Sequence, residues 1–208
     1  MSEPGLRERK RIAAMRRIQD VAYDLFERDG FDAVTIETIA ETAEVSPSSV
    51  YRYFGTKEQL VLWDEYDPAA FQAFADAVAG HEPLAAMRLA VDAVAATFFK
   101  EDRPRIERMV RLAYEVPSIQ AVVLQQIQEA GEAIAAIVAG ARERDPHELE
   151  VQVFASVVVA VVEVGIRHWW QQGFRPDLHE VIDAGLVQVA AGLPLEAAEE
   201  PSAPRPSC

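Results

Sequence analysis

Short hydroxyl side chains and cations gather between residues 46 and 57, a combination suited to contacting a nucleic acid. Ser46, Ser48 and Ser49 are small enough to let a helix approach a base edge closely, and serine can donate to or accept from any base. Arg52 and Lys57 carry the positive charge that phosphate oxygens attract. The chemistry that this segment predicts is noncovalent recognition of DNA.

Two short helices are expected to position these side chains. Thr35 can cap a first helix, because its hydroxyl can accept from an amide left free in the first turn. Ser46 is a second cap, and Pro47 stands at the first helical position, where its missing N–H costs nothing. A separation of about three residues between the two helices is typical of a helix-turn-helix. A further capping box, Thr56-Lys57-Glu58-Gln59, opens the next helix.

The run from Val45 to Leu60 resembles the recognition helix of the TetR (tetracycline repressor) family. The resemblance spans about residues 12–62, with Phe26, Gly30, Phe31 and Thr35 standing where the family's first-helix pattern has them. It implies an all-α regulator with a three-helix DNA-binding domain and a helical second domain. One departure is Glu44, since the family usually has glycine in this turn. A positive φ angle at Glu44 would cost about 1 kcal/mol.

The resemblance also implies roles for single residues. Tyr51, Tyr53 and Lys57 clamp phosphates, and Thr35 holds the backbone from the preceding helix, whereas Phe54 packs inside. Arg52 either reads guanine or binds phosphate only. The predicted DNA-contacting residues are Arg9, Lys10, Arg11, Thr35, Ser46, Pro47, Ser48, Ser49, Tyr51, Arg52, Tyr53 and Lys57.

The net charge of −14 argues against nucleic acid at first sight, but its distribution reverses that impression. Residues 1–17 hold six basic and two acidic groups, and residues 1–63 have a net charge of −2. Residues 64–208 hold the remaining −12. Phosphate contact depends on the local field, because charges beyond about 10 Å are screened. The basic start of the chain (residues 7–11) is therefore either a DNA contact or a solvated helix start, and the first alternative is favoured.

Apolar residues recur at helical spacing throughout, and no segment alternates like a strand. We expect about nine helices in an all-α fold. The predicted domains are a DNA-binding domain (1–62), a ligand-binding and dimerisation domain (63–193) and a disordered tail (194–208). Asp145 and Asp177 each precede a glutamate by three residues and predict acidic capping boxes. Pro68 predicts a helix break at 66–68, either a simple boundary or a hinge.

A single recognition helix buries too little surface for tight specific binding. The predicted partner is therefore a palindromic double-stranded operator, bound by a homodimer. The last two helices are the expected dimer seam, because residues 151–164 are apolar around most of their circumference and small residues such as Gly165 and Gly185 allow close contact. Glu163 and Arg167 are four residues apart and are expected to pair.

An aromatic-rich set in the second half predicts a pocket for an elongated apolar ligand, with ordinary core packing as the alternative for each member. Arg167-His168-Trp169-Trp170 is similar to an actinobacterial branch of the family associated with acyl-coenzyme A-like ligands. The arginines at 103, 105, 108 and 111 either meet phosphates at the pocket mouth or form a solvated basic face. The predicted ligand-binding residues are Trp63, Phe71, Phe74, Phe98, Phe99, Met109, Tyr114, Phe154 and Trp169.

An enzyme is not expected, since the four histidines are scattered and no glycine-rich phosphate loop occurs. No cofactor or metal is predicted. The alternative function is a helical lipid or acyl carrier without DNA binding. We expect no membrane span and a cytoplasmic location, because no leader sequence is visible and the lone cysteine, Cys208, sits in the tail.

Overall fold

A computed structural model describes residues 5–95 and 100–194, which form ten α-helices and no strand. The all-α prediction is confirmed, with one helix more than the nine expected. Phe98, Phe99, Cys208 and the tail from residue 195 lie outside the described residues. The helices are α1 (Leu6–Asp29), α2 (Ile36–Thr42), α3 (Pro47–Phe54), α4 (Lys57–Leu62), α5 (Asp67–Val78), α6 (Pro83–Val94), α7 (Lys100–Glu115), α8 (Pro117–Arg142), α9 (Leu149–Gln171) and α10 (Leu178–Ala190).

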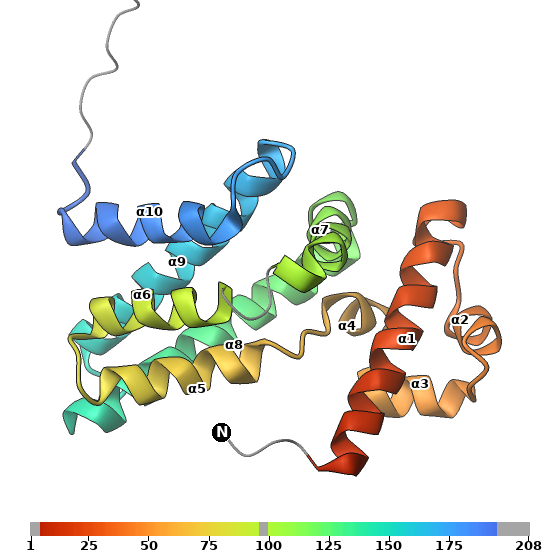
Figure 1. Cartoon of the computed structure of the whole chain (residues 1–208), viewed down its shortest axis with the longest axis horizontal. Helices are drawn as coiled ribbons and strands as arrows, with labels where there is room; N and C mark the ends of the chain where they lie inside the picture. The colour runs from red at the N-terminus through yellow and green to blue at the C-terminus, as the bar shows by residue number, and fades with distance from the viewer. Residues whose placement is uncertain (1–4, 96–99, 195–208) are drawn as a thin grey trace, which may run out of the picture.

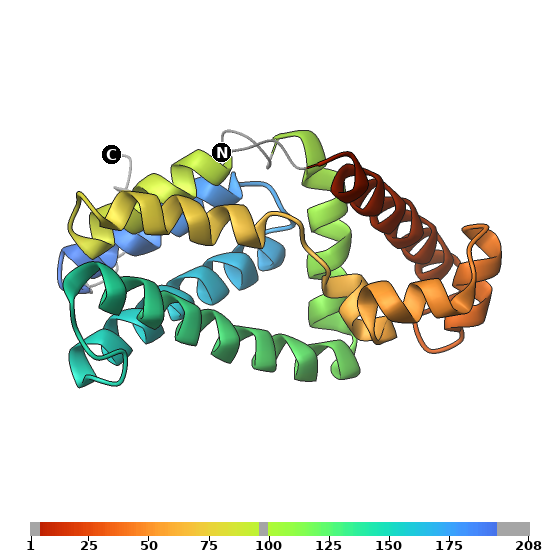
Figure 2. The ribbon, with the colours of Figure 1, turned by 90° about the horizontal axis from the view of Figure 1, so that it is seen from below.

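The helices pack around two apolar cores. We call α1–α4 the head and α5–α10 the body; α7 stands between α1 and the rest of the body in both views (Figures 1 and 2). In the head, Ile18, Ile39, Val50 and Leu60 come from four different helices and are fully buried. Ile119 of α8 is buried in the same core, so the head is joined to the body by apolar packing.

Three of the predicted caps are confirmed. The hydroxyls of Thr35, Ser46 and Thr56 accept from the amides three residues on, at 3.1, 3.2 and 3.1 Å. These bonds satisfy amide hydrogens that the first turns of α2, α3 and α4 would otherwise leave free.

The two acidic capping boxes were predicted wrongly in detail. Glu148 does bond back to the amide of Asp145 at 2.9 Å, but this closes a turn, and α9 begins only at Leu149. Asp177 stands at the N-cap of α10 without a side-chain capping bond. A turn and a helix start use the same local bonds, which is why this pattern cannot separate them.

The break predicted at Pro68 is confirmed, and it lies at residues 63–66. Pro68 falls in the first turn of α5, where a missing N–H leaves nothing unpaired. The N-cap residue of α5 is Tyr66. Asp64 Oδ1 accepts from the Tyr66 amide at 2.6 Å and orders the connector.

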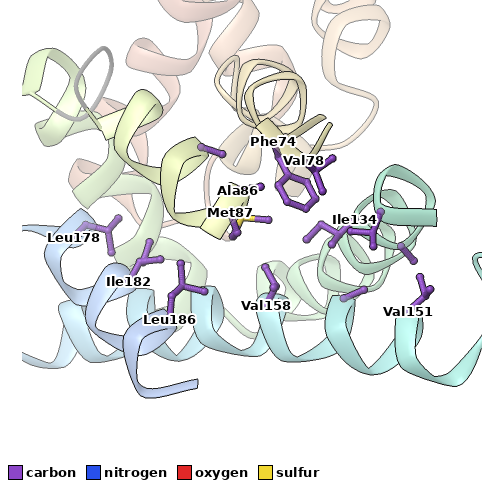
Figure 3. Packing of buried hydrophobic residues seen from close by; sticks show 14 of the residues in the cluster. Phe74, Val78, Ala86, Met87, Ile134, Val151, Val158, Leu178, Ile182 and Leu186 are labelled. Atoms are coloured by element: carbon purple, nitrogen blue, oxygen red, sulfur yellow. The ribbon is translucent and has the colours of Figure 1, made fainter. Parts of the chain in front are cut away.

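The body core is built from residues on α5–α10 that meet between the helices (Figure 3). Two glycines let α9 and α10 approach closely. A Cβ on Gly165 would lie 3.1 Å from Ile182 Cγ1, and one on Gly185 would lie 2.7 Å from Val161 Cγ1. The close contact predicted at these glycines therefore exists, within one chain.

Helix α9 is long and apolar enough to cross a bilayer by length and composition alone. It packs instead as a core helix, with Val151, Val158 and Trp169 buried in the body. Its predicted Glu163–Arg167 pair forms at 2.8 Å. Such a pair suits a helix partly exposed to water.

Candidate DNA interface and effector site

The serines at the start of α3 form one hydroxyl network. Ser46 Oγ lies 2.9 Å from both Ser48 Oγ and Ser49 Oγ, and Arg52 donates to Ser49 Oγ at 3.3 Å. Ser46 and Ser48 are exposed to solvent, and Ser49 is half-buried. Pro47 fixes the first turn beside them. The α3 N-terminus thus presents small rotatable donors and acceptors next to a cation, as a helix entering the major groove requires.

The aromatic residues of α3 divide between surface and core. Tyr51 is 49% exposed, whereas Phe54 is buried, as predicted for its packing role. Tyr53 is half-buried against the edge of Phe54, with the Arg52 guanidinium 5.1 Å above its ring. Tyr51 and Arg52 are therefore the α3 side chains most accessible to a duplex.

Lys57 has a structural role that the sequence did not reveal. Its Nζ donates to the carbonyl oxygens of Phe31 and Val34, at 2.6 and 2.9 Å, and lies 4.1 Å from the Phe31 ring. These bonds hold the connection between α1 and α2 against α4. An ammonium has three N–H donors, so one remains for a phosphate, and that contact stays a prediction.

The basic start of α1 is exposed. Arg11 bonds Glu8 through three contacts of 2.9–3.2 Å. The Glu8 carboxylate raises the pKa of Arg11 by accepting these hydrogen bonds. Arg9 and Lys10 lie on the exposed surface of the same turn. The predicted basic cluster is therefore accessible to a duplex, and its contact with DNA stays a prediction.

Glu44 adopts a positive φ angle of 54° in the turn between α2 and α3. The turn thus keeps the geometry for which glycine is the usual residue. The strain is local, because the amide of the next residue, Val45, still bonds Ala40 O at 2.9 Å. The helix-turn-helix geometry is kept despite the glutamate.

The predicted ligand-binding residues occupy three different places. Phe74 and Trp169 are buried in the body core, and Phe71 and Tyr114 pack against it. The Tyr114 ring stacks on Trp170, with centroids 4.9 Å apart. These residues surround one region of the body, which fits either core packing or a pocket that opens on binding.

Trp63 and Met109 line a small cavity at the junction of head and body, with a volume of about 20 Å³. This is room for a single water molecule. Phe154 packs against the body core and also lines a groove of about 400 Å³ between α6, α8 and α9. Arg142 and Arg144 on the rim of that groove are paired with Glu82 and Glu150.

Three of the four arginines of α7 have partners within the protein that neither expected alternative included. Arg105 and Arg108 bond acidic residues of α1, and Arg103 bonds Glu107 and the Phe174 carbonyl oxygen. Arg111 lies over the Phe174 ring at 5.8 Å. Arg103, Arg105 and Arg108 are bound to protein groups and do not form a free phosphate site, whereas Arg111 is exposed to solvent. Sequence spacing alone could not reveal partners about 80 residues away.

Comparison with known proteins matches both parts of the chain. Residues 18–62 match the family described as bacterial regulatory proteins, tetR family, and residues 81–194 match the MftR C-terminal domain. The regulator TcmR of Streptomyces glaucescens is 30% identical over 175 residues, which are 80% of this chain and 77% of TcmR. MftR of Mycobacterium tuberculosis, a proposed mycofactocin biosynthesis regulator, is 27% identical over 188 residues, 89% of this chain and 93% of MftR.

Among solved structures, the TetR-family repressor FadR of Thermus thermophilus, in complex with lauroyl-CoA, has the same fold. The TM-score is 0.54 at 21% identity, and the match covers 91% of this chain and all of FadR. The helix-turn-helix geometry, the matches at both ends and the relatedness to TcmR agree. The chain belongs to the TetR family of transcriptional regulators, with an N-terminal DNA-binding domain and a C-terminal ligand-binding domain.

Proposed function

We propose that the chain is a ligand-responsive repressor that binds a palindromic operator as a homodimer and leaves it when an apolar or acyl-type effector enters the body. The observation that carries the proposal is the exposed, capped start of α3, where three serines stand beside Arg52 and Tyr51. We place the DNA-binding domain at 1–62 and the ligand-binding and dimerisation domain at 63–193. A carrier protein would have no use for that serine-rich helix.

Dimerisation through α9 and α10 is supported by an apolar strip that the monomer leaves in water. Val153 and Val164 of α9 are 51% and 48% exposed, and Val187 of α10 is 43% exposed. Ser156 and Ala160 continue the strip on α9 at helical spacing. Small and branched apolar residues on two adjacent helices suit a four-helix seam between copies, and regulators of this family bind DNA as dimers.

DNA binding is tested by measuring the affinity for a duplex selected from a random library, over a series of salt concentrations. A specific binder loses affinity steeply with salt, by a slope of about −0.9 per neutralised phosphate, whereas a carrier shows no such slope. Tyr51→Ala and Arg52→Ala should lower the affinity at least about tenfold. Arg28→Ala, an exposed change at the other end of α1, is the control. Unchanged affinity in both α3 variants would contradict the proposed interface.

An acyl thioester is the effector class that we propose. The support is the stacked aromatic pair Tyr114 and Trp170 beside the body core, together with the lauroyl-CoA held by the structurally similar FadR. Chemical denaturation with and without lauroyl-CoA tests it, because a ligand at 100 times its dissociation constant adds about 2.7 kcal/mol to the free energy of unfolding. Coenzyme A and lauric acid alone are the controls. An unchanged unfolding curve would rule out this ligand.

A further inference from the structure

Helix α1 of the head and helix α7 of the body are joined by arginine side chains. Arg105 Nη2 lies 2.8 Å from Asp20 Oδ1, and its Nη1 donates to Gln19 Oε1 at 2.9 Å. Gln19 is buried and donates in turn to the carbonyl oxygens of Leu60 and Trp63, both at 2.9 Å. One guanidinium therefore connects α7 to α1 and, through Gln19, to the end of α4.

Arg108 makes the second connection, one turn further along α7. It donates to Asp24 at 2.6 Å and to Glu27 at 2.7 Å, and its guanidinium lies 5.2 Å above the Tyr23 ring. We call Arg105 and Arg108 the arginine ladder. Its acceptors on α1 are spaced by three and four residues and so lie on one face of that helix.

The ladder complements the apolar joint between α4 and α8. There, Ile119 is buried against the head core that contains Leu60 and Val61. Apolar packing has no preferred direction, so this joint alone permits the head to rotate. A planar guanidinium that bonds two acceptors does impose direction. The ladder, together with the ion pair between Arg16 of α1 and Asp102 of α7 at 2.8 Å, is thus the polar part of the junction that can define the angle of α1 relative to the body.

The opposite face of α7 belongs to the body. Ile106 and Val110 are buried in the body core, and Met109 packs against both cores. The ladder residues alternate with these apolar residues along the helix. A helix held in this way transfers its own position to α1, and α1 lies between α7 and α2 (Figure 1). The reading helix follows α2 after one short turn, so it moves with α1.

We propose that Arg105 and Arg108 are positioning residues that set the angle of the head and thereby the half-site spacing that the homodimer accepts. This inference rests on the proposed function, because spacing has meaning only for a dimer on paired half-sites. Half-site spacing is a geometric consequence of where two reading helices stand. Neither arginine needs to touch DNA.

The test measures affinity for a panel of duplexes in which two selected half-sites are kept and the base pairs between them are varied by up to two in each direction. For the wild type, we expect about a tenfold loss or more at two base pairs from the optimum. Arg105→Gln and Arg108→Gln should flatten this profile to within about threefold. Arg111→Gln, on the same helix but over a body ring, should keep the sharp profile.

A charge exchange separates positioning from folding. The double variant Arg108→Glu with Asp24→Arg restores an ion pair, with the positive charge now on α1 and the negative charge on α7. It should recover most of the dependence of affinity on half-site spacing. Arg108→Lys keeps the charge without the planar fork and serves if the neutral variants do not fold. It should give an intermediate profile. The distance between spin labels on the two α3 helices gives a second readout, and the ladder variants should broaden its distribution.

Two outcomes overturn the inference in different ways. In the first outcome, the affinity of the wild type depends steeply on half-site spacing, and that of the folded ladder variants does so equally. If these variants then differ only by a lower melting temperature, the arginines merely stabilise the fold. If the wild type binds no paired half-sites, the proposed dimer function fails, and the inference falls with it.

Discussion

Glu44 is the residue whose backbone is most clearly under strain in the head, because its φ of 54° favours glycine. Replacing it with glycine should raise the free energy of unfolding by about 0.5–1 kcal/mol, measured by urea denaturation. Glu41→Gly, inside α2, is the matched control and should lower the free energy of unfolding by about 1 kcal/mol. Equal effects of both changes would show that the turn is not strained.

Asp64, in the connector between head and body, should make stability depend on pH. Burial, followed by the charges of Asp67 and Asp102, raises its pKa to about 8 from the ordinary 3.8. The folded protein thus holds a proton that the unfolded chain releases, so the stability that this proton provides is complete below about pH 4 and is lost as the pH rises through 8.

Asp64→Asn should remove this dependence, since the amide stays neutral and its oxygen can still accept from the Tyr66 amide. The variant should be more stable than the wild type at pH 8 by about 1–2 kcal/mol and nearly equal to it at pH 4. Thermal unfolding from pH 4 to pH 9 measures this. Parallel profiles for the two proteins would mean that Asp64 is ionised in the native state.

The sequence could predict the roles of residues whose hydrogen-bond partners are close by in the chain. Thr35, Ser46 and Thr56 cap helices because each needs only the amide three residues away. Lys57 was assigned a phosphate, and its bonds to Phe31 and Val34 were missed, because a carbonyl 23 or 26 residues away leaves no local signal.

Among the elements, the close contact between α9 and α10 depends on glycine, which has no side chain, at positions 165 and 185. Gly185→Ala would place a methyl 2.7 Å from Val161 Cγ1, and valine is stiff about its first side-chain torsion. We expect a loss of about 1–3 kcal/mol from overpacking, measured by thermal or urea unfolding. Gly140→Ala, also helical but with nothing within 4 Å of the added Cβ, should instead gain about 1 kcal/mol.

The all-helical architecture followed from apolar periodicity, and the described residues form ten helices. The start of α9 was placed three residues too early, because Asp145 and Glu148 bond each other in a turn as they would in a cap. How the elements join could not be predicted. The pairing of α7 with α1 involves solvent-accessible charges that any exposed helix can carry.

For the whole molecule, the proposed homodimer predicts that one charged substitution on the exposed apolar strip of α9 dissociates the two subunits. Val164→Glu should give a monomer in sedimentation equilibrium and lower operator affinity about 100-fold or more, because one reading helix binds weakly. Leu124→Glu, at a side chain of α8 that is more exposed than Val164, is the control and should stay dimeric. A dimeric Val164→Glu protein would place the seam elsewhere.

The uneven charge of the chain also bears on how the regulator searches a chromosome. Most of the negative charge belongs to residues 64–208, so a duplex that meets the body is repelled. If the basic start of α1 contacts DNA as predicted, collisions through the body end without capture and those through α1 persist. An acidic body would then orient the protein on approach and reduce the time lost to nonproductive adsorption on bulk genomic DNA.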